Sequence, residues 1–274
     1  MPSPHADDLI ASLRAAAVPG RAEGEKRYLK SERVHLGTSM PAIRQVAVAF
    51  RKAHPALSRA ELLALCDDLW ARGIHEGNAL VVELLDLHQP LLAARDLAFL
   101  ERLLREAHTW ALSDGLSASV VGPLVERLPA LQRTLDRWAK DPDFWIRRAS
   151  LLGLLLALRA GRGDLALFGK RADPMLGETE FFVRKAIGWV LRDTSRRRPA
   201  EVAGWILPRA ARASGLTVRE ATKHLPARDR AKILAAHQAG KAGRAETARA
   251  AKRPKAMPHR RVPRAGRASR PERP

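Results

Sequence analysis

Short helices separated by proline and glycine account for the hydrophobic pattern of this chain. Apolar residues recur every three to four positions over segments of about two to four turns, and the loops between them are brief. We find no segment with the alternating pattern of a strand. The predicted helices are 6–18, a loosely helical basic segment at 21–35, one opened by Pro41 and capped by Ser39, one capped by Ser58, then 76–88, 92–107, 108–127, 130–139, 144–160, 163–172, 180–195, 199–212, 216–225 and 227–239. Such a series predicts an all-α chain of helical hairpins.

A repeated motif refines this prediction. Ile146-Arg147-x-Ala149, Val183-Arg184-x-Ala186 and Val218-Arg219-x-Ala221 start 37 and 35 residues apart. A period near 36 with two helices per unit is typical of HEAT or tetratricopeptide solenoids, and the signature residues of the latter are missing. We therefore expect an α-α superhelix of HEAT-like repeats with a basic concave face.

One segment, residues 180–193, separates into two helical faces. A buried stripe is expected from Val183, Ile187, Val190 and Leu191. The opposite face carries Phe182, Lys185, Trp189 and Arg192. A tryptophan beside cations suits a partner with phosphates, sugars or bases. The alternative is that Trp189 packs beneath a neighbouring helix, as large aromatic residues commonly do.

The charge of the chain points to a polyanionic partner. Its 274 residues carry a net charge of +20, with a pI near 11.3. Nucleic acid is the first candidate for the partner, and an anionic membrane surface is the second. Residues 241–274 hold twelve positive and two negative side chains and no apolar periodicity. We expect residues 1–239 to form the folded domain, and 240–274 to be a disordered tail that attracts nucleic acid or only confers solubility.

Arg148 and Lys185 occupy the same position in two copies of the repeat. Equivalent positions of a solenoid line one surface, so the two cations predict a track for phosphates. The alternative is an ordinary solvated face on a very basic protein.

A carboxylate accompanies a second tryptophan. Trp110 and Asp114 are four residues apart and share a helix face, away from the stripe formed by Leu112, Leu116 and Val120. A carboxylate that faces DNA repels it, and one reason for its presence is stabilisation of positive charge that develops on a reacting sugar. The alternative is a salt bridge between Asp114 and a nearby arginine.

Other chemistry lacks support in the sequence. The nine histidines show no metal-ligand spacing, and no Gly-rich nucleotide motif occurs, so we expect no metal and no cofactor. The only cysteine, Cys66, excludes an intramolecular disulfide and favours a reducing, cytoplasmic compartment. We expect no signal peptide, no membrane span, no obligate protein partner and a monomer.

The segments that carry these residues resemble a known family, the AlkD-like DNA alkylation repair glycosylases, which are built of HEAT-like repeats. The resemblance covers about residues 8–235 and is most specific over 180–193. The matching segments are EFFVRKAIGWVLRD at 180–193, TWALSD at 109–114, FWIRRAS at 144–150 and REATKHL at 219–225, with looser matches in RYLK at 27–30 and LGTSMP at 36–41. Two departures are Thr109, where the family often has a second tryptophan, and Ser39-Met40, where it has other polar residues.

The resemblance implies hydrolytic excision of cationic alkylpurines, such as N3-methyladenine and N7-methylguanine, from duplex DNA without flipping of the lesion into a closed pocket. It implies a catalytic trio of Trp110, Asp114 and Trp189. It also implies DNA contacts, which would come from Arg148, Lys185, Phe182, Arg192, Tyr28 and Ser39. Two other interpretations remain: a non-catalytic HEAT-like protein that binds damaged or branched DNA, and a scaffold that docks an acidic protein.

Overall fold

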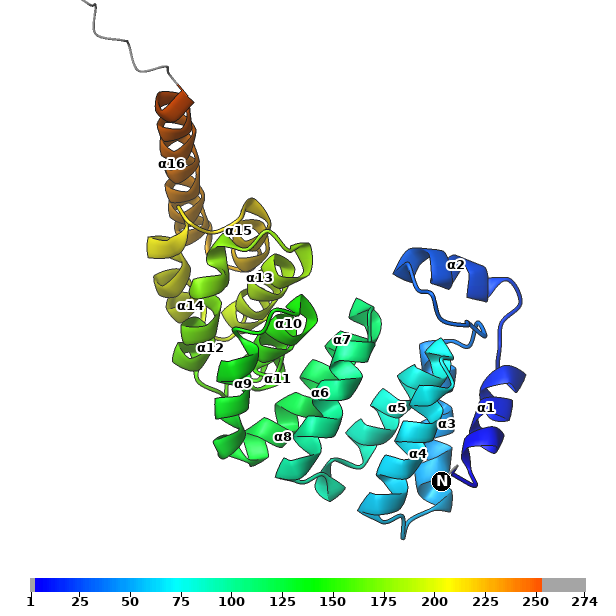
Figure 1. The fold of residues 1–274 in the computed structure, drawn as a ribbon. Helices are drawn as coiled ribbons and strands as arrows, with labels where there is room; N and C mark the ends of the chain where they lie inside the picture. Colours follow the sequence, from blue (N-terminus) through cyan, green and yellow to red (C-terminus); the bar gives the residue numbers. More distant parts are fainter. Residues whose placement is uncertain (1–2, 253–274) are drawn as a thin grey trace, which may run out of the picture.

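The protein is an all-α solenoid whose helices follow one another along an arc (Figure 1). The computed structural model describes residues 3–252, with side chains described as far as residue 244. The first eight α-helices are α1 (Ala6–Ala15), α2 (Arg21–Leu29), α3 (Met40–Ala53), α4 (Arg59–Ala71), α5 (His75–Leu87), α6 (Leu97–Glu106), α7 (Trp110–Gly115) and α8 (Gly122–Arg127). The remaining eight are α9 (Gln132–Trp138), α10 (Phe144–Leu152), α11 (Leu155–Arg159), α12 (Leu165–Ala172), α13 (Phe181–Ser195), α14 (Pro199–Ile206), α15 (Gly215–Ala221) and α16 (Ala227–Lys252).

Shorter helical turns complete the chain. A π-helical segment, Leu116–Val121, joins α7 to α8. The 3-10 turns are Gln89–Leu91, Ala94–Asp96, Pro129–Leu131, Pro174–Gly177 and Leu207–Arg209. Residues 3–252 contain no strand, only two isolated bridges, and no helix among them is both long enough and apolar enough to cross a membrane. The predicted all-α class is confirmed.

Successive helices pack as layers of a curved stack, so each repeat buries its apolar face against its neighbours. α3 packs on α5, α10 on α13, and α13 on α15. The arc opens between α2 at one end and α15 at the other (Figure 1). The aliphatic and alanine positions of all three motif copies are fully buried: Ile146, Ala149, Val183, Ala186, Val218 and Ala221.

Ion pairs between neighbouring repeats show the predicted period directly. Arg105 donates to Asp141, Arg162 to Glu126, and Arg209 to Asp173, and each pair is separated by 36 positions. The spacing recurs because equivalent positions of adjacent repeats stack side by side.

The arginine of the motif holds the loop that precedes its helix. Arg147 donates to the carbonyl oxygens of Asp141 at 2.7 Å and Pro142 at 2.9 Å. Arg184 makes the equivalent bond to the carbonyl oxygen of Thr179. The arginine therefore has the same structural role in both copies of the motif. Some of the hydrogen-bond donors of Arg147 and Arg184 are used by backbone carbonyl oxygens.

Several predicted helices, among them 6–18, 21–35, 92–107 and 199–212, are shorter in the structure, and three further differences are larger. The predicted helix 144–160 is two helices, α10 and α11, because the chain turns at Gly153, where a Cβ would lie 3.1 Å from the side chain of Leu135. The predicted helix 108–127 is interrupted by the π-helical segment. The helix predicted at 227–239 continues to Lys252, thirteen residues into the segment expected to be disordered.

The composition of 240–252 explains this last difference. Alanine, lysine, arginine and glutamate are strong helix formers even where no apolar stripe exists. The helix also approaches the rest of the fold closely at Gly240, where a Cβ would overlap Ala211. The expected disorder of residues 253–274 lies outside the described residues.

Candidate functional site

Eight of the nine predicted site residues line one hollow of about 410 Å³. Its walls come from α2, α7, α10 and α13, which lie far apart in the sequence. We call it the central hollow, and its lining residues are Tyr28, Trp110, Asp114, Arg148, Phe181, Phe182, Lys185, Trp189 and Arg192. Phe181 is the residue that sequence reasoning missed; its position directly before Phe182 was the available signal in the sequence, and its ring is exposed in the structure.

Ser39, the ninth predicted residue, does not line the central hollow. Its hydroxyl accepts a hydrogen bond from the backbone nitrogen of Ala42 at 3.4 Å and caps α3. The predicted helix cap is confirmed. Ser39 therefore has a structural role at the start of α3, whether or not it contacts DNA.

The local fold of α7 presents Trp110 and Asp114 side by side. Both are half-buried, one helical turn apart, while Leu112 and Leu116 on the other face are buried. The π-helical segment begins directly after α7, and a Cβ at Gly115 would lie 2.8 Å from Val82. Close packing of α7 on α5 and the local change of helical pitch together fix the direction of the Asp114 carboxylate.

Arg148 forms a two-pronged ion pair with Asp114. Its Nε lies 2.7 Å from Oδ1, and its Nη2 lies 2.7 Å from Oδ2. The guanidinium also donates to the carbonyl oxygen of Phe182, and its carbon lies 5.8 Å from the ring centre of Phe182 and 5.9 Å from that of Trp189. The Arg148 side chain is only 3% exposed.

This arrangement changes the role expected for Arg148. The sequence predicted a phosphate contact, but the guanidinium is buried and its donors point to Asp114 and to backbone. The structure contains the salt bridge with an arginine that the sequence offered as the alternative to a catalytic role for Asp114. It leaves the carboxylate 15% exposed on the wall of the central hollow, so the pair orients Asp114 without hiding it.

The electrostatics of Asp114 combine two opposing effects. Burial raises the pKa of the Asp114 carboxyl, and the ion pair with Arg148 offsets part of that rise. Charges in such a poorly solvated place interact more strongly than they do in water.

Trp189 is held by a second carboxylate. Its Nε1 donates to Oδ2 of Asp193 at 3.0 Å, and Arg159 and Arg192 donate to the same carboxyl group. Burial opposes ionisation of Asp193, but the hydrogen bonds from Arg159 and Arg192 outweigh it and lower its pKa. The indole is half-buried, so it packs on the core with one side and lines the central hollow with the other.

Lys185 and Arg192 share one acidic partner. Lys185 Nζ lies 2.6 Å from Oε1 of Glu220, and Arg192 pairs with the other oxygen. Burial opposes ionisation of Glu220, but these cations lower its pKa. Arg148 and Lys185 line one surface as predicted, yet Arg148 pairs with the preceding repeat and Lys185 with the following one.

Tyr28 lines one edge of the central hollow from α2. Its side chain is 73% exposed, and its ring stands edge-on to Trp110 with centroids 5.9 Å apart. Phe182 is supported from behind by Trp145, whose ring centre is 4.8 Å away. The geometry therefore combines one carboxylate, two indoles and partly exposed cations, which suits a cationic ligand attached to a phosphate backbone.

Comparison with known proteins agrees with this geometry. A family model described as "DNA alkylation repair enzyme" matches residues 9–225. The chain belongs to the DNA alkylation repair enzyme family. The matched range includes every residue that lines the central hollow.

Two solved structures share the fold. A predicted DNA alkylation repair enzyme from Enterococcus faecalis is 21% identical, with a TM-score of 0.69, and the match covers 77% of this chain and 97% of that one. AlkD2 from Streptococcus mutans is 17% identical, with a TM-score of 0.55, and the match covers 69% and 91% of the respective chains. A search of curated proteins finds no match to this chain.

Proposed function

We propose that this family member is a monofunctional DNA glycosylase that hydrolyses the N-glycosidic bond of cationic alkylpurines, such as N3-methyladenine and N7-methylguanine, in duplex DNA. The observation that carries the proposal is the Asp114 carboxylate, oriented by Arg148 on the wall of a hollow that contains Trp110 and Trp189. The proposal also draws on the family resemblance of these segments.

The chemistry asks little of an enzyme beyond charge stabilisation. Alkylation at N3 or N7 makes the purine cationic, so the bond from C1′ to nitrogen breaks with its electron pair moving to the base, which leaves neutral. The sugar becomes oxocarbenium-like, water adds to C1′, and its proton passes to solvent or to a carboxylate. Asp114 stabilises the cationic sugar, and the indoles attract both the sugar and the lesion. No general acid is needed.

In this proposal Arg148 is a positioning residue. Its fork fixes the plane of the Asp114 carboxylate, while each oxygen keeps a lone pair directed away from the guanidinium. Lys185 and Arg192 exchange their Glu220 contacts for phosphates, and Tyr28, Phe181 and Phe182 pack against the sugar-phosphate chain. The lesion stays at the open hollow and is not flipped into a closed pocket, and the protein acts as a monomer.

The test is the release of methylated base from duplex DNA treated with a methylating agent, separated by chromatography. Wild type and Asp114→Asn are compared with excess enzyme in single-turnover conditions. Loss of the charge should lower the excision rate at least about a hundredfold, while binding to the duplex is retained. Equal rates for the two proteins would remove Asp114 from the mechanism.

One observation favours a second candidate, a non-catalytic protein that binds damaged DNA. The Arg148 guanidinium neutralises Asp114, which is the only carboxylate among the described residues that line the central hollow. If wild type and Asp114→Asn both bind the duplex and neither releases base, this candidate replaces the glycosylase.

A further inference from the structure

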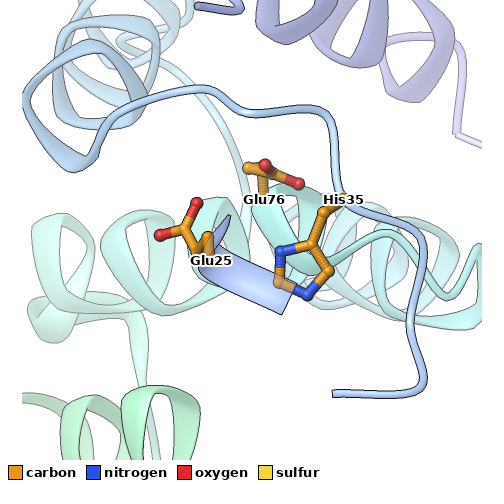
Figure 2. Close-up of side chains that lie close together, drawn as sticks. All are labelled: Glu25, His35 and Glu76. Atoms are coloured by element: carbon orange, nitrogen blue, oxygen red, sulfur yellow. The ribbon is translucent and has the colours of Figure 1, made fainter. Parts of the chain in front are cut away.

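A second cluster of polar side chains lies outside the central hollow, at the junction of α2, the loop before α3, and α5. The side chains of Glu25, His35 and Glu76 lie close together there (Figure 2). Their ligand atoms, one from each residue, all lie within 4.8 Å of one another. The sequence predicted no metal site because these residues are 10 and 41 positions apart and show no ligand spacing; the tertiary structure brings them together.

Glu76 is the fixed member of the cluster. It is completely buried, and its carboxylate accepts hydrogen bonds from the backbone nitrogens of Leu36, Gly37 and Thr38 at 2.9, 2.6 and 3.3 Å. The Leu36 nitrogen contacts both carboxylate oxygens, so three contacts go to Oε1 and one goes to Oε2, which keeps coordination capacity. Among the ion pairs of the described residues, none involves Glu76, which is unusual for a carboxylate this deeply buried.

The other two members carry buried polar atoms without partners. Both ring nitrogens of His35 and Oε2 of Glu25 are buried and make no hydrogen bond in the described part of the chain. One ring nitrogen of His35 faces the two carboxylates (Figure 2). Unpaired buried polar atoms are costly, and three in one cluster indicate a missing partner.

A neighbouring ring fixes the orientation of His35. His75 stacks on it with centroids 4.4 Å apart and planes 10° apart, and His75 itself is 4% exposed. The rotation of the His35 ring is therefore limited by packing, as it is for a typical metal ligand.

The charge around His35 is opposite to that of the protein as a whole. Its electrostatic neighbours are Glu76, Glu25, Glu23 and one cation, Lys26. Arg21 also pairs with Oε1 of Glu25 at 3.5 Å. Three carboxylates therefore face two cations, and the local excess of negative charge, in a chain of net charge +20, favours a bound cation.

We propose that Glu25, His35 and Glu76 bind one divalent transition-metal ion of the zinc type. One imidazole nitrogen with two carboxylate oxygens is a donor set that suits zinc and its neighbours, whereas calcium and magnesium take oxygen ligands. Ligand bonds of about 2.0–2.2 Å place two ligand atoms at most about 4.4 Å apart. The cluster therefore contracts slightly on binding, and the half-buried Glu25 side chain supplies that movement.

The ion would fasten α2 to α5. Leu29 is the only buried residue of α2, so packing alone holds this helix weakly. Glu25 lies one turn before Tyr28, whose ring meets Trp110 at the central hollow. A metal bond at Glu25 would therefore set the height of Tyr28 above that hollow.

The experiment uses the untagged, full-length protein after treatment with a chelator. Zinc chloride is titrated by calorimetry, and amide hydrogen exchange of residues 21–29 is compared with and without zinc. Wild type should bind one ion with a dissociation constant of about 1 μM or below, and α2 should become protected. Cobalt should reproduce the binding with a visible absorbance band, and calcium should not compete.

Glu25→Gln and His35→Asn should each weaken zinc binding at least about tenfold. The matched control is His108→Asn, because His108 is exposed and its φ of 52° suits asparagine. Binding of no ion by wild type, or equal affinity in all variants, would overturn the proposal. Should His35→Asn fail to fold, Glu25→Gln decides, because it changes one atom on a weakly buried helix. These measurements read metal binding directly and are independent of glycosylase activity.

Discussion

Arg148 and Asp114, 34 positions apart on α10 and α7, meet through two hydrogen bonds of 2.7 Å each. The pair joins adjacent repeats at the wall of the central hollow. The Arg148 guanidinium stabilises the packing of α7 on α10. It also orients the Asp114 carboxylate, which is proposed to act on the sugar.

Removal of Arg148 should therefore destabilise the fold. Arg148→Gln leaves the Asp114 carboxylate nearly buried without its cation, and breaking such a buried pair costs about 3–5 kcal/mol of unfolding free energy. Denaturant unfolding measures this cost. The control, Arg162→Gln, breaks an exposed pair with Glu126 and should cost at most about 1 kcal/mol. Similar losses in the two variants would show that the Arg148 pair has no special weight.

The excision rate should fall in acid. Burial raises the pKa of Asp114 above its ordinary value of about 3.9, and the proposed role requires the ionised form. The rate should therefore decrease as the pH drops through this raised pKa, which a single-turnover pH profile measures.

The same group affects stability in the opposite direction. Because the folded pKa of Asp114 is raised, its contribution to stability is complete below the unfolded pKa and is lost as the pH rises through the folded one. The difference in unfolding free energy between wild type and Asp114→Asn should follow that sign. For the pH profile of excision described above, an excision rate that stays constant down to pH 4 would contradict the proposed role of Asp114.

Neutralisation of Glu220 should strengthen DNA binding. Glu220→Gln removes the charge that Lys185 and Arg192 share, so Lys185 becomes available to phosphates and Arg192 keeps only its pairing with Asp193. Affinity for plain duplex DNA should rise, and the slope of log affinity against log salt should steepen by about 0.9 for each phosphate gained. Fluorescence anisotropy at several salt concentrations measures both.

The control for Glu220 is Glu126→Gln, which makes the same change of net charge outside the central hollow. An equal gain in both variants would mean that only total charge matters, and the local release of Lys185 would be rejected.

A methyl group at Gly188 should disturb the packing of α13 on α15. A Cβ at Gly188 would lie 2.6 Å from the Cβ of Glu220 and 3.1 Å from the carbonyl oxygen of Thr217. We expect Gly188→Ala to lose about 1–3 kcal/mol of unfolding free energy, measured by denaturant unfolding.

Gly204 of α14 provides the comparison for this prediction. A Cβ at Gly204 meets nothing within 4 Å, so Gly204→Ala should gain about 0.5–1 kcal/mol through helix propensity alone. A neutral or stabilising Gly188→Ala would show that α13 and α15 can separate without cost.

The sequence by itself determined the helices, their buried faces and the repeat. The stripe formed by Val183, Ile187, Val190 and Leu191 is fully buried, and Lys185, Trp189 and Arg192 lie opposite it on the central hollow. These features are local, because helical periodicity and a fixed repeat length are written in neighbouring residues. The placement of Trp110, Asp114 and Trp189 in one hollow could likewise be expected from the family resemblance.

Only the tertiary structure decided which charges are paired. Spacing along the chain does not say that Arg148 pairs with Asp114 or that Lys185 pairs with Glu220. With 49 basic and 29 acidic residues, many partners are compatible with one repeat length. The selection depends on side-chain directions and on burial across repeats, as does the meeting of Glu25, His35 and Glu76, and these quantities exist only after the helices have packed.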